Sequence, residues 1–272
     1  RNAFRIANSD RKGPVLIDIT KDVTAAKISY TPQEPLPLNP PPVFTDKEVK
    51  EVAAMINAAQ KPVLYIGGGV AASKAGDEVN ELIEIADIPA AYTLMAAGIV
   101  GYDNKRSLGL LGMHGSIAAN KAVDRADLVV ALGARFSDRV ALNPKKFAKN
   151  AQKIQIDIDT SEINKNVLVD LGVTADVKEF LQRLIPHIKK KDHSDWISIS
   201  TEWKKRTGDV KCQGAQLHPD EIIHAVCDLT DKETVYVTDV GQHQMWAAQY
   251  IKHQKTEDFI TSGGLGTMGF GY

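Results

Sequence analysis

The chain has 272 residues, enough for one large domain or two modest ones with a core that needs no disulfide or metal. Its 33 basic and 34 acidic residues give a net charge of −1, and a nucleic-acid-binding surface needs a basic excess. No apolar run approaches the roughly 20 residues of a membrane span. The two cysteines, Cys212 and Cys227, exclude a disulfide scaffold or a zinc ribbon. We therefore expect no nucleic-acid partner and no membrane.

The first 44 residues divide into a short segment and a linker. Ala3, Phe4 and Ala7 have helical spacing, and after a turn the apolar run Pro14–Ile19 predicts a buried strand. One helix and one strand are too little to fold alone. Six of the twelve prolines lie in the segment PQEPLPLNPPP, which is typical of a stiff, extended linker. We assign residues 1–30 to the end of a domain and residues 31–44 to the linker.

After the linker, short apolar strands alternate with amphipathic helices. Thr45-Asp-Lys-Glu48 has the form of a helix capping box. The expected strands are Pro62–Ile66, a strand near Pro89–Thr93, Leu108–Leu111, Asp127–Leu132 and Lys153–Ile158, and the expected further helices are Ser73–Ala86, Gly115–Ala126 and Val177–Ile185. Such alternation indicates a parallel sheet covered on both faces. The predicted fold class is α/β, with a doubly wound, Rossmann-like domain over residues 45–188.

A second, shorter α/β pattern follows. Residues 189–216 are expected to be a linker with a helix over Asp195–Arg206, in which Trp196, Ile199 and Trp203 share one face. Residues 217–272 then predict, in order, a helix at Pro219–Leu229, a strand at Thr234–Thr238, a helix at Gln244–Ile251, a strand at Phe259–Thr261 and a glycine-rich loop. The chain opens without Met and closes on that loop, although such loops usually connect elements. We expect an internal piece of a larger protein, with its second domain truncated.

Open parallel sheets bind ligands beyond the carboxyl ends of their strands. After the first strand, Gly67, Gly69 and Ala72 have the spacing G-x-G-x-x-A, which fits a phosphate contact or, equally, a tight strand–helix turn. His114 stands between glycines in Gly112–Gly115, where it either contacts a ligand or belongs to a helix-capping loop.

Charged residues follow the next strands. Arg135, Asp138 and Arg139 lie in GARFSDR and suit a phosphate or an internal ion-pair network. Asp157 and Asp176 fit either a ribose contact or a helix N-cap. Taken together, these strand ends favour a dinucleotide that lies across the edge of the sheet.

The second domain has its own candidate loop between a strand and a helix. Residues 240–244 can place backbone N–H groups and a helix dipole against a diphosphate, with the imidazole of His243 beside it. If the two strands of this domain are neighbours, the glycine-rich loop at Ser262–Gly271 lies next to this site.

Six segments occur in the order found in the large catalytic subunit of acetolactate synthases, which the chain resembles over essentially its whole length: RKGPVLIDITKDV, LGMHGS, GARFSDR, KIQIDIDTSEINKN, VTDVGQHQMWAAQ and SGGLGTMGFG. The resemblance implies a thiamine-diphosphate enzyme with three α/β domains that bind, in order, the aminopyrimidine, FAD, and the diphosphate with Mg²⁺. Residues 1–30 would end the first domain, residues 45–188 would form the FAD-binding domain, and residues 217–272 would begin the third.

The resemblance also implies two sets of cofactor-binding residues. Those matched to FAD contacts are Arg11, Gly67, Gly68, Gly69, Thr93, Leu94, Gly112, Met113, His114, Gly115, Gly133, Arg135, Asp138, Arg139, Asp157, Ile158 and Asp176. Those matched to thiamine diphosphate are Val240, Gly241, Gln242, His243, Gln244, Gly266 and Met268, the methionine supporting the bent cofactor. Ser137 departs from the usual motif RFDDR, although both arginines remain. This near-match favours the FAD-binding branch of the family over its FAD-free, catabolic branch.

The implied reaction is decarboxylation of pyruvate on thiamine diphosphate, with transfer of the hydroxyethyl unit to a second 2-oxo acid. The product is 2-acetolactate or 2-aceto-2-hydroxybutyrate, in branched-chain amino-acid biosynthesis, and FAD does no net redox work. The family's catalytic glutamate would lie before Arg1 and its Mg²⁺ ligands after Tyr272, so we expect no catalytic or metal-binding residue and no turnover in this piece. The resemblance further implies a homodimer or larger assembly, room for a regulatory small subunit, and a cytoplasmic location if the source is bacterial.

Two other classes of function compete with this interpretation. One is an isolated nucleotide-binding module that uses the middle domain alone. The other is an NAD-dependent dehydrogenase, suggested by the G-x-G-x-x-A spacing, but it lacks a convincing catalytic His–acid pair and leaves GQHQMW unexplained. Flavin absorbance in the purified protein, and its loss in Arg135→Ala, would separate these interpretations.

Overall fold

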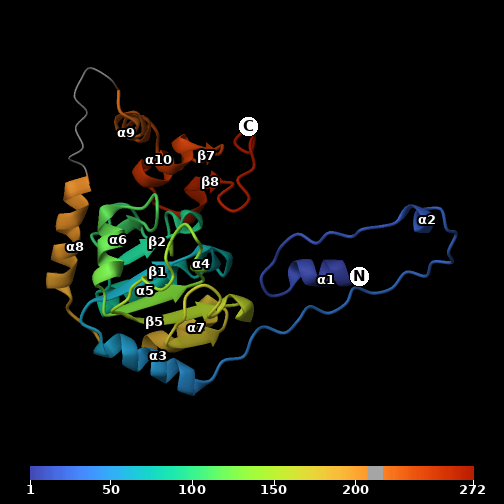
Figure 1. The fold of residues 1–272 in the computed structure, drawn as a ribbon, viewed down its shortest axis with the longest axis horizontal. Helices are drawn as coiled ribbons and strands as arrows, with labels where there is room; N and C mark the ends of the chain where they lie inside the picture. The colour runs from blue at the N-terminus through green and yellow to red at the C-terminus, as the bar shows by residue number, and fades with distance from the viewer. Residues whose placement is uncertain (208–216) are drawn as a thin grey trace. The chain divides into compact units, whose positions relative to one another are not determined.

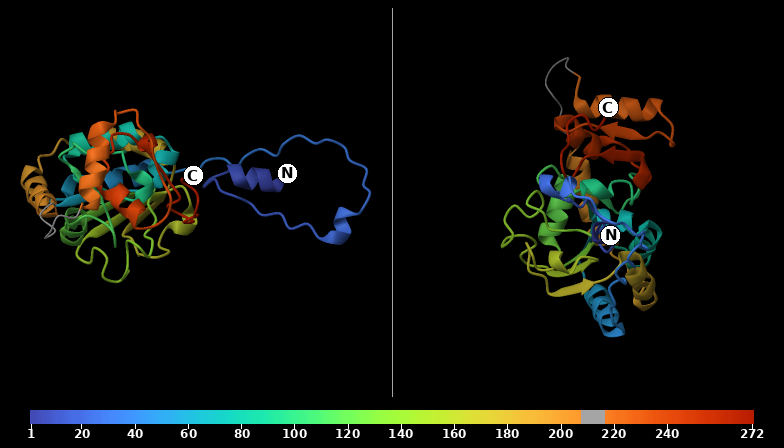
Figure 2. Two further views of the ribbon diagram at one scale, coloured as in Figure 1. Left: turned by 90° about the horizontal axis from the view of Figure 1, so that it is seen from above. Right: turned by 90° about the vertical axis from the view of Figure 1, so that its right-hand side faces the viewer.

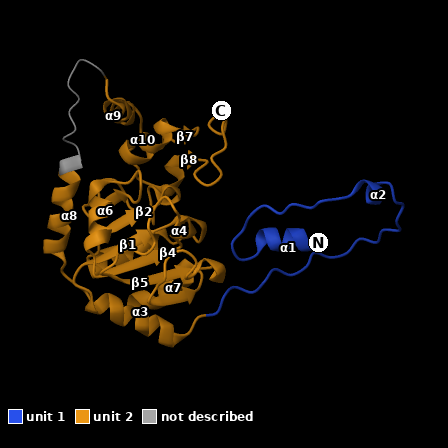
Figure 3. Ribbon diagram, in the orientation of Figure 1, with its two compact units in different colours: residues 1–43 blue, residues 44–272 orange. Residues whose placement is uncertain are grey.

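The computed structural model describes residues 1–207 and 217–272. The chain divides into two compact units, residues 1–43 and residues 44–272 (Figure 3). Cys212 lies outside the described residues, and Cys227 is a half-buried free thiol.

The first unit contains little regular structure. Helix α1 (Asn2–Asn8) forms where it was predicted, and a single turn of helix, α2 (Lys21–Thr24), follows. The buried strand predicted for Pro14–Ile19 is wrong: the segment has no strand assignment and Leu16 is 93% exposed. A strand needs neighbouring strands to pair its backbone groups, and no strand is present among residues 1–43.

The second unit is built on a six-stranded parallel sheet, which confirms the predicted α/β class. Its strands are β1 (Pro62–Ile66), β2 (Ala90–Tyr92), β3 (Ser107–Leu110), β4 (Leu128–Leu132), β5 (Gln152–Asp157) and β6 (Leu171–Thr174). They lie in the order β3-β2-β1-β4-β5-β6. Strands β1, β2 and β5 are labelled in Figure 1. The order reverses between β1 and β4, which is where a doubly wound sheet opens a crevice for a ligand.

Helices cover both faces of this sheet. The elements in chain order are α3 (Asp46–Ala58), α4 (Gly68–Ala72), α5 (Gly76–Ala86), α6 (Ile117–Arg125), α7 (Val177–Leu184) and α8 (Ser194–Thr207). Along β1, Leu64 and Ile66 pack into the core beneath α3, α5 and α7, while Val63 and Tyr65 face the core beneath α6 and α8. Each face therefore has its own apolar layer, because successive strand residues point to opposite sides. The predicted capping box at Thr45 is also present.

Three local predictions need correction. The helix expected over Ser73–Ala86 starts only at Gly76, as α5, and the separate short helix α4 precedes it. Lys74 lies between them at φ +55°, and a left-handed residue cannot continue a right-handed helix. Strand β6 was not predicted. In α8, Ile199 is 46% exposed instead of sharing the buried face. That face is centred on Trp196, Ser200 and Trp203, which leaves Ile199 at its edge.

The end of the second unit forms a smaller α/β group. It consists of α9 (Pro219–Leu229), β7 (Tyr236–Thr238), α10 (Gln242–Tyr250) and β8 (Phe259–Thr261), and the two strands pair in parallel. In Figure 1 and in the right-hand view of Figure 2 this orange-to-red group lies above the central sheet. Backbone contact supports that placement, because Tyr102 N donates to His253 O at 2.8 Å. Within the described ranges, no helix is long and apolar enough to cross a membrane.

Candidate functional site

The carboxyl ends of the central strands meet at one edge of the sheet, and most of the predicted site residues lie there. Backbone hydrogen bonds connect the carboxyl ends of β1, β4 and β5. Gly67 N donates to Leu132 O at 2.9 Å, and Gly133 N donates to Ile156 O at 2.8 Å. After β2, Thr93 N donates to Ile66 O at 2.9 Å. The fold thus brings together residues that are up to 90 positions apart in the sequence.

The glycines after β1 and β4 pack directly on one another. A Cβ atom on Gly67 would lie 2.2 Å from Gly133 O, and one on Gly69 would lie 2.6 Å from Gly133 Cα. Gly69 N also donates to Gly133 O at 2.9 Å. Close backbone packing at the reversal point therefore explains why these three positions are glycine, and the strand–helix turn is supported. Only Gly68, half-buried between them, faces a flexible neighbour, Met95.

Thr93 and Leu94 occupy the end of β2, next to the glycine turn. The hydroxyl of Thr93 is buried and has no hydrogen-bond partner among the described residues. Water or a bound molecule can supply the partner of such a hydroxyl. Leu94 opens the short 3-10 helix η1 (Leu94–Ala96) and is half-buried.

The Gly112–Gly115 loop after β3 contacts the loop after β4. Met113 N donates to Arg139 O at 2.8 Å, and a Cβ on Gly112 would lie 2.6 Å from the same oxygen. Gly112 has φ +109°, a conformation that favours glycine. The side chains of Met113 and His114 are exposed. The side chain of Ser116, and not that of His114, caps α6 by accepting a hydrogen bond from Ala119 N. The His114 imidazole is exposed to solvent.

The GARFSDR loop alternates between core and surface. Ala134 and Phe136 are buried, whereas Arg135, Asp138 and Arg139 are exposed. Asp138 and Arg139 approach each other at 4.0 Å, with both side chains largely in solvent. No ion pair of Arg135 is found among the described residues. The exposed arginines therefore carry no burial cost, and the Arg135 guanidinium is available to an anion.

The acidic candidates differ in their surroundings. Asp157, at the end of β5, is 8% exposed and accepts a hydrogen bond from Asp159 N at 3.0 Å. Ile158 beside it is half-buried. Asp176 is the N-cap of α7, where its carboxylate accepts from Glu179 N at 3.1 Å. For Asp176 the helix-cap interpretation thus has direct support.

The second candidate loop lies between β7 and α10. Gly241, at φ +146°, precedes α10 and supplies no side-chain cap, so the first N–H groups of that nine-residue helix lack a side-chain partner. His243 is exposed. Gln244 is buried, and its Nε2 donates to Thr261 Oγ1 at 2.6 Å, which ties α10 to β8. The N-terminus of α10 can therefore receive an anion, whereas the Gln244 side chain is already hydrogen-bonded to Thr261.

The glycine-rich loop folds back onto this site, as predicted for neighbouring strands. Asp239 accepts from Gly269 N at 2.9 Å and from Val240 N at 2.9 Å. These hydrogen bonds hold the pKa of Asp239 below its usual value. Gly266 is exposed, at φ +69°, and Met268 is 85% exposed. The loop is therefore anchored at Asp239, and it leaves Met268 at the surface.

The two candidate sites are linked through Met95. A Cβ on Gly68 would lie 3.0 Å from Met95 Cβ, and one on Gly263 would lie 2.7 Å from Met95 Sδ. Met95 was not predicted from the sequence, and its only signal there is a large apolar residue just after the end of a strand. The remaining candidate, Arg11, is an exposed residue of the first unit, and its role stays a prediction.

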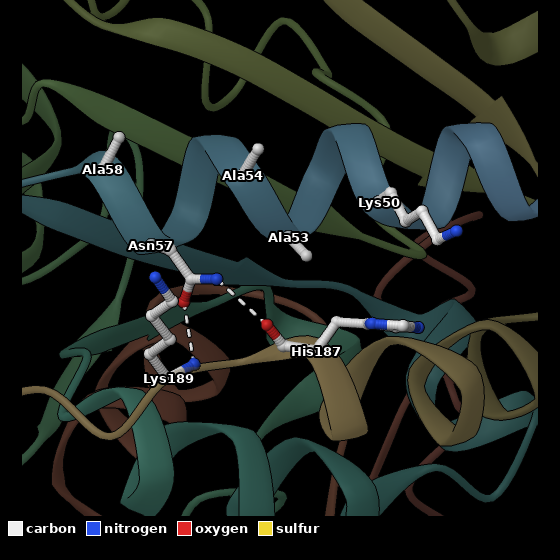
Figure 4. A pocket seen from close by; sticks show the side chains of 7 residues that line it. All are labelled: Lys50, Ala53, Ala54, Asn57, Ala58, His187 and Lys189. Carbon is white, nitrogen blue, oxygen red and sulfur yellow. Dashed lines mark hydrogen bonds between the residues drawn. The ribbon is translucent and has the colours of Figure 1, made fainter.

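A separate surface hollow has no relation to these loops. It lies between α3 and the 3-10 helix η3 (Ile185–His187) and is lined by Lys50, Ala53, Ala54, Asn57, Ala58, His187 and Lys189 (Figure 4). Asn57 fixes it by donating to His187 O at 2.9 Å and accepting from Lys189 N at 2.8 Å. Because α3 ends just before β1 begins, the hollow lies at the amino edge of the sheet and contains none of the predicted site residues.

Comparison with known proteins matches two segments of the chain to domain families. Residues 49–184 match "Thiamine pyrophosphate enzyme, central domain", and residues 239–272 match "Thiamine pyrophosphate enzyme, C-terminal TPP binding domain". The chain is 40% identical over 275 residues to the Escherichia coli acetolactate synthase isozyme 1 large subunit. This alignment covers 99% of the chain and 48% of that protein. It is 39% identical over 274 residues to the Lactococcus lactis acetolactate synthase large subunit, with coverage of 99% and 48%. It is also 39% identical over 283 residues to the chloroplastic acetolactate synthase 1 of Nicotiana tabacum, with coverage of 100% and 42%. The chain thus spans a little under half the length of these relatives.

Proposed function

The chain belongs to the thiamine pyrophosphate enzymes, and on that premise we propose that the protein carrying it is the large catalytic subunit of an acetolactate synthase. The observation that carries this proposal is the likeness to acetolactate synthases along the whole chain, through both α/β groups and the segment before them. The dehydrogenase hypothesis loses its support, because packing of Gly67 against Gly133 accounts for its one motif. An isolated nucleotide-binding module does not account for the match of residues 239–272.

In this proposal the central domain holds FAD across the reversal point of the sheet. The buried Thr93 hydroxyl and the exposed guanidinium of Arg135 fit such a ligand, because one is an unpartnered polar atom and the other suits a diphosphate. Met113 and His114, in the loop after β3, and Arg139, in the loop after β4, have exposed side chains beside this site. FAD has no net redox role in the proposed reaction, so these residues serve binding and domain structure.

The C-terminal group holds the diphosphate of thiamine diphosphate in the same proposal. The uncapped N-terminus of α10 offers N–H groups and a favourable dipole, and His243 stands in the first turn with its side chain exposed. Met268 supports the cofactor from the glycine-rich loop. When bound, thiamine diphosphate supplies the nucleophilic carbon and the electron sink for decarboxylation. Among the described residues no group of three His, Cys, Asp or Glu side chains could hold Mg²⁺, so no step is assigned to the metal.

The proposed substrates are pyruvate and a second 2-oxo acid. One pyruvate loses CO₂, and its remaining two carbons join the carbonyl carbon of the acceptor. The proposal includes an assembly of at least two catalytic subunits, room for a regulatory subunit, and a cytoplasmic location in a bacterial source.

Flavin content provides the first test. We expect the purified protein to carry bound FAD, and we expect Arg135→Ala to lose most of it because the guanidinium fork is removed. Lys121→Ala, an exposed charge on the outer surface of α6, serves as the control and should retain FAD. A colourless wild-type protein that still forms acetolactate would point instead to the FAD-free branch. Failure of the complete protein that carries this chain to form acetolactate would refute the proposed activity.

A further inference from the structure

Three consecutive carbonyl groups in the loop that carries Arg135 accept hydrogen bonds from side chains of other elements. Ala134 O accepts from Gln155 Nε2 at 3.5 Å, and Arg135 O accepts from Tyr65 Oη at 3.5 Å. Phe136 O accepts from Asn166 Nδ2 at 2.8 Å. Tyr65 lies in β1, Gln155 in β5, and Asn166 in the loop before β6. The loop is thus held from three sides.

Two of these donors are fully buried. Tyr65 and Gln155 have 0% exposure, and they lie on the face of the sheet covered by α6 and α8. Burial raises the pKa of the Tyr65 hydroxyl, and the nearby Arg135 charge offsets this only in part, so the phenol stays protonated and can donate. Gln155 Nε2 also donates to Glu162 O at 3.2 Å. Burying polar side chains in a strand is unfavourable unless they make hydrogen bonds. The Tyr65 hydroxyl donates to the loop, and Gln155 Nε2 donates both to the loop and to Glu162 O.

The side chains of the loop complete the arrangement. Phe136 is 2% exposed, and its ring lies 5.9 Å from the Tyr65 ring and 5.4 Å from the Phe147 ring. The Phe136 side chain is buried and its carbonyl oxygen accepts a hydrogen bond from Asn166. Arg135, between the buried residues Ala134 and Phe136, is exposed to solvent. The backbone on both sides of Arg135 is therefore fixed independently of any ligand.

We propose that Asn166, Gln155 and Tyr65 are positioning residues for Arg135, which hold its loop in the conformation that receives a dinucleotide diphosphate. Asn166 makes the shortest of the three hydrogen bonds and is the decisive member. This inference rests on the proposed FAD site, but the fixation of the loop itself is independent of it. A pre-ordered loop loses less freedom when a ligand binds, so loosening it weakens binding without removing any ligand contact.

The chain offers a matched pair of variants. Asn166→Asp replaces the donor to Phe136 O by an acceptor of the same shape. Asn164→Asp adds the same charge two residues away but keeps its hydrogen bond, because Asn164 Oδ1 accepts from Val169 N at 2.9 Å. Both side chains lie in an exposed stretch, so both variants should fold. Asn166→Ala removes the donor without adding charge and should agree with Asn166→Asp.

Two measurements test the proposal. Hydrogen exchange of the amides in residues 133–141 should speed up in Asn166→Asp and stay unchanged in Asn164→Asp, at equal melting temperature. The Kd for FAD should rise by about 3- to 30-fold in Asn166→Asp, the range expected from one lost hydrogen bond plus a carbonyl–carboxylate repulsion. In an Arg135→Lys background, Asn166→Asp should have little further effect on Kd, because the two residues act as a unit.

The outcomes separate this proposal from the proposed function. Unchanged exchange in Asn166→Asp refutes the positioning role, whether or not FAD binds. An equal rise in Kd with and without the Arg135→Lys change refutes action through Arg135. If the wild-type chain binds no FAD while Asn166→Asp still loosens residues 133–141, the FAD site is refuted and the fixation of the Arg135 loop is supported.

Discussion

Replacing Gly67 by alanine tests whether the glycines at the reversal point of the sheet serve backbone packing. Gly67 has φ −112° and ψ 177°, which alanine adopts freely, so any effect comes from the added methyl group. That group would lie 2.2 Å from Gly133 O and 2.5 Å from Ala134 Cα, and ordinary contact begins at 3.4 Å. Both neighbours are backbone, so the ends of β1 and β4 must separate by about 1 Å.

The expected cost follows from that separation. Overpacking of this kind costs about 1–3 kcal/mol. The hydrogen bonds from Gly67 N to Leu132 O and from Gly69 N to Gly133 O, both 2.9 Å, are stretched or lost. At about 1 kcal/mol each, they bring the total to about 3–5 kcal/mol, a large part of the 5–15 kcal/mol of a typical domain.

Urea denaturation followed by tryptophan fluorescence measures this cost, because Trp196 and Trp203 are buried in α8 of the same unit. Gly76→Ala is the matched control, since a Cβ there has nothing within 4 Å. Gly76 is the first residue of α5, so this control should change the free energy of unfolding by no more than about 0.5 kcal/mol. Loss of less than about 0.5 kcal/mol in Gly67→Ala would refute the packing argument.

Three further substitutions test other parts of the fold. Thr45→Ala removes the cap of α3 and should lower the free energy of unfolding by about 1 kcal/mol, while Thr45→Ser should not; equal melting temperatures for the two variants would contradict this. Trp196→Phe removes the buried hydrogen bond to Pro62 O at 3.1 Å and should lower the free energy of unfolding by about 1–3 kcal/mol, measured by urea denaturation. An unfolding midpoint equal to that of the wild type would contradict this. Burial would raise the pKa of Asp258, but hydrogen bonds from His253 and from backbone N–H groups hold it below its usual 3.8. The stabilisation by Asp258 is therefore complete above that value and is lost as pH falls through the depressed pKa. The stability difference between wild type and Asp258→Asn should therefore stay level down to about pH 4 and shrink as pH falls further, and a difference that stays constant below about pH 4 would show that the carboxylate is not the cause.

The sequence predicted the central sheet well, because buried parallel strands are continuous apolar runs such as Pro62–Ile66. It failed where the pattern depends on neighbours. Pro14–Ile19 has the composition of a buried strand but no partner strand in its unit. Strand β6, Leu171-Gly-Val-Thr, is short and only partly buried, so its apolar signal is weak.

The candidate site divides in the same way. The rule that ligands meet the carboxyl ends of parallel strands selected the loops after β1, β3, β4 and β5 as candidates, and the structure places these loops at one edge of the sheet. The contacts between those loops could not be predicted. Gly67 and Gly133 are 66 positions apart, and only the closed fold shows that they touch. Asn166 and Gln155 lie in the segment KIQIDIDTSEINKN, but a polar residue in such a segment does not reveal which carbonyl its side chain binds.

The stoichiometry of pyruvate consumption tests the central proposal most directly. The protein carrying this chain, supplied with thiamine diphosphate, FAD and Mg²⁺, is incubated with pyruvate labelled at its carboxyl carbon, and released CO₂ and acetolactate are both measured. We predict one CO₂ released for each acetolactate formed and two pyruvate molecules consumed. Release of CO₂ with acetaldehyde in place of acetolactate, or no release at all, would contradict the proposal.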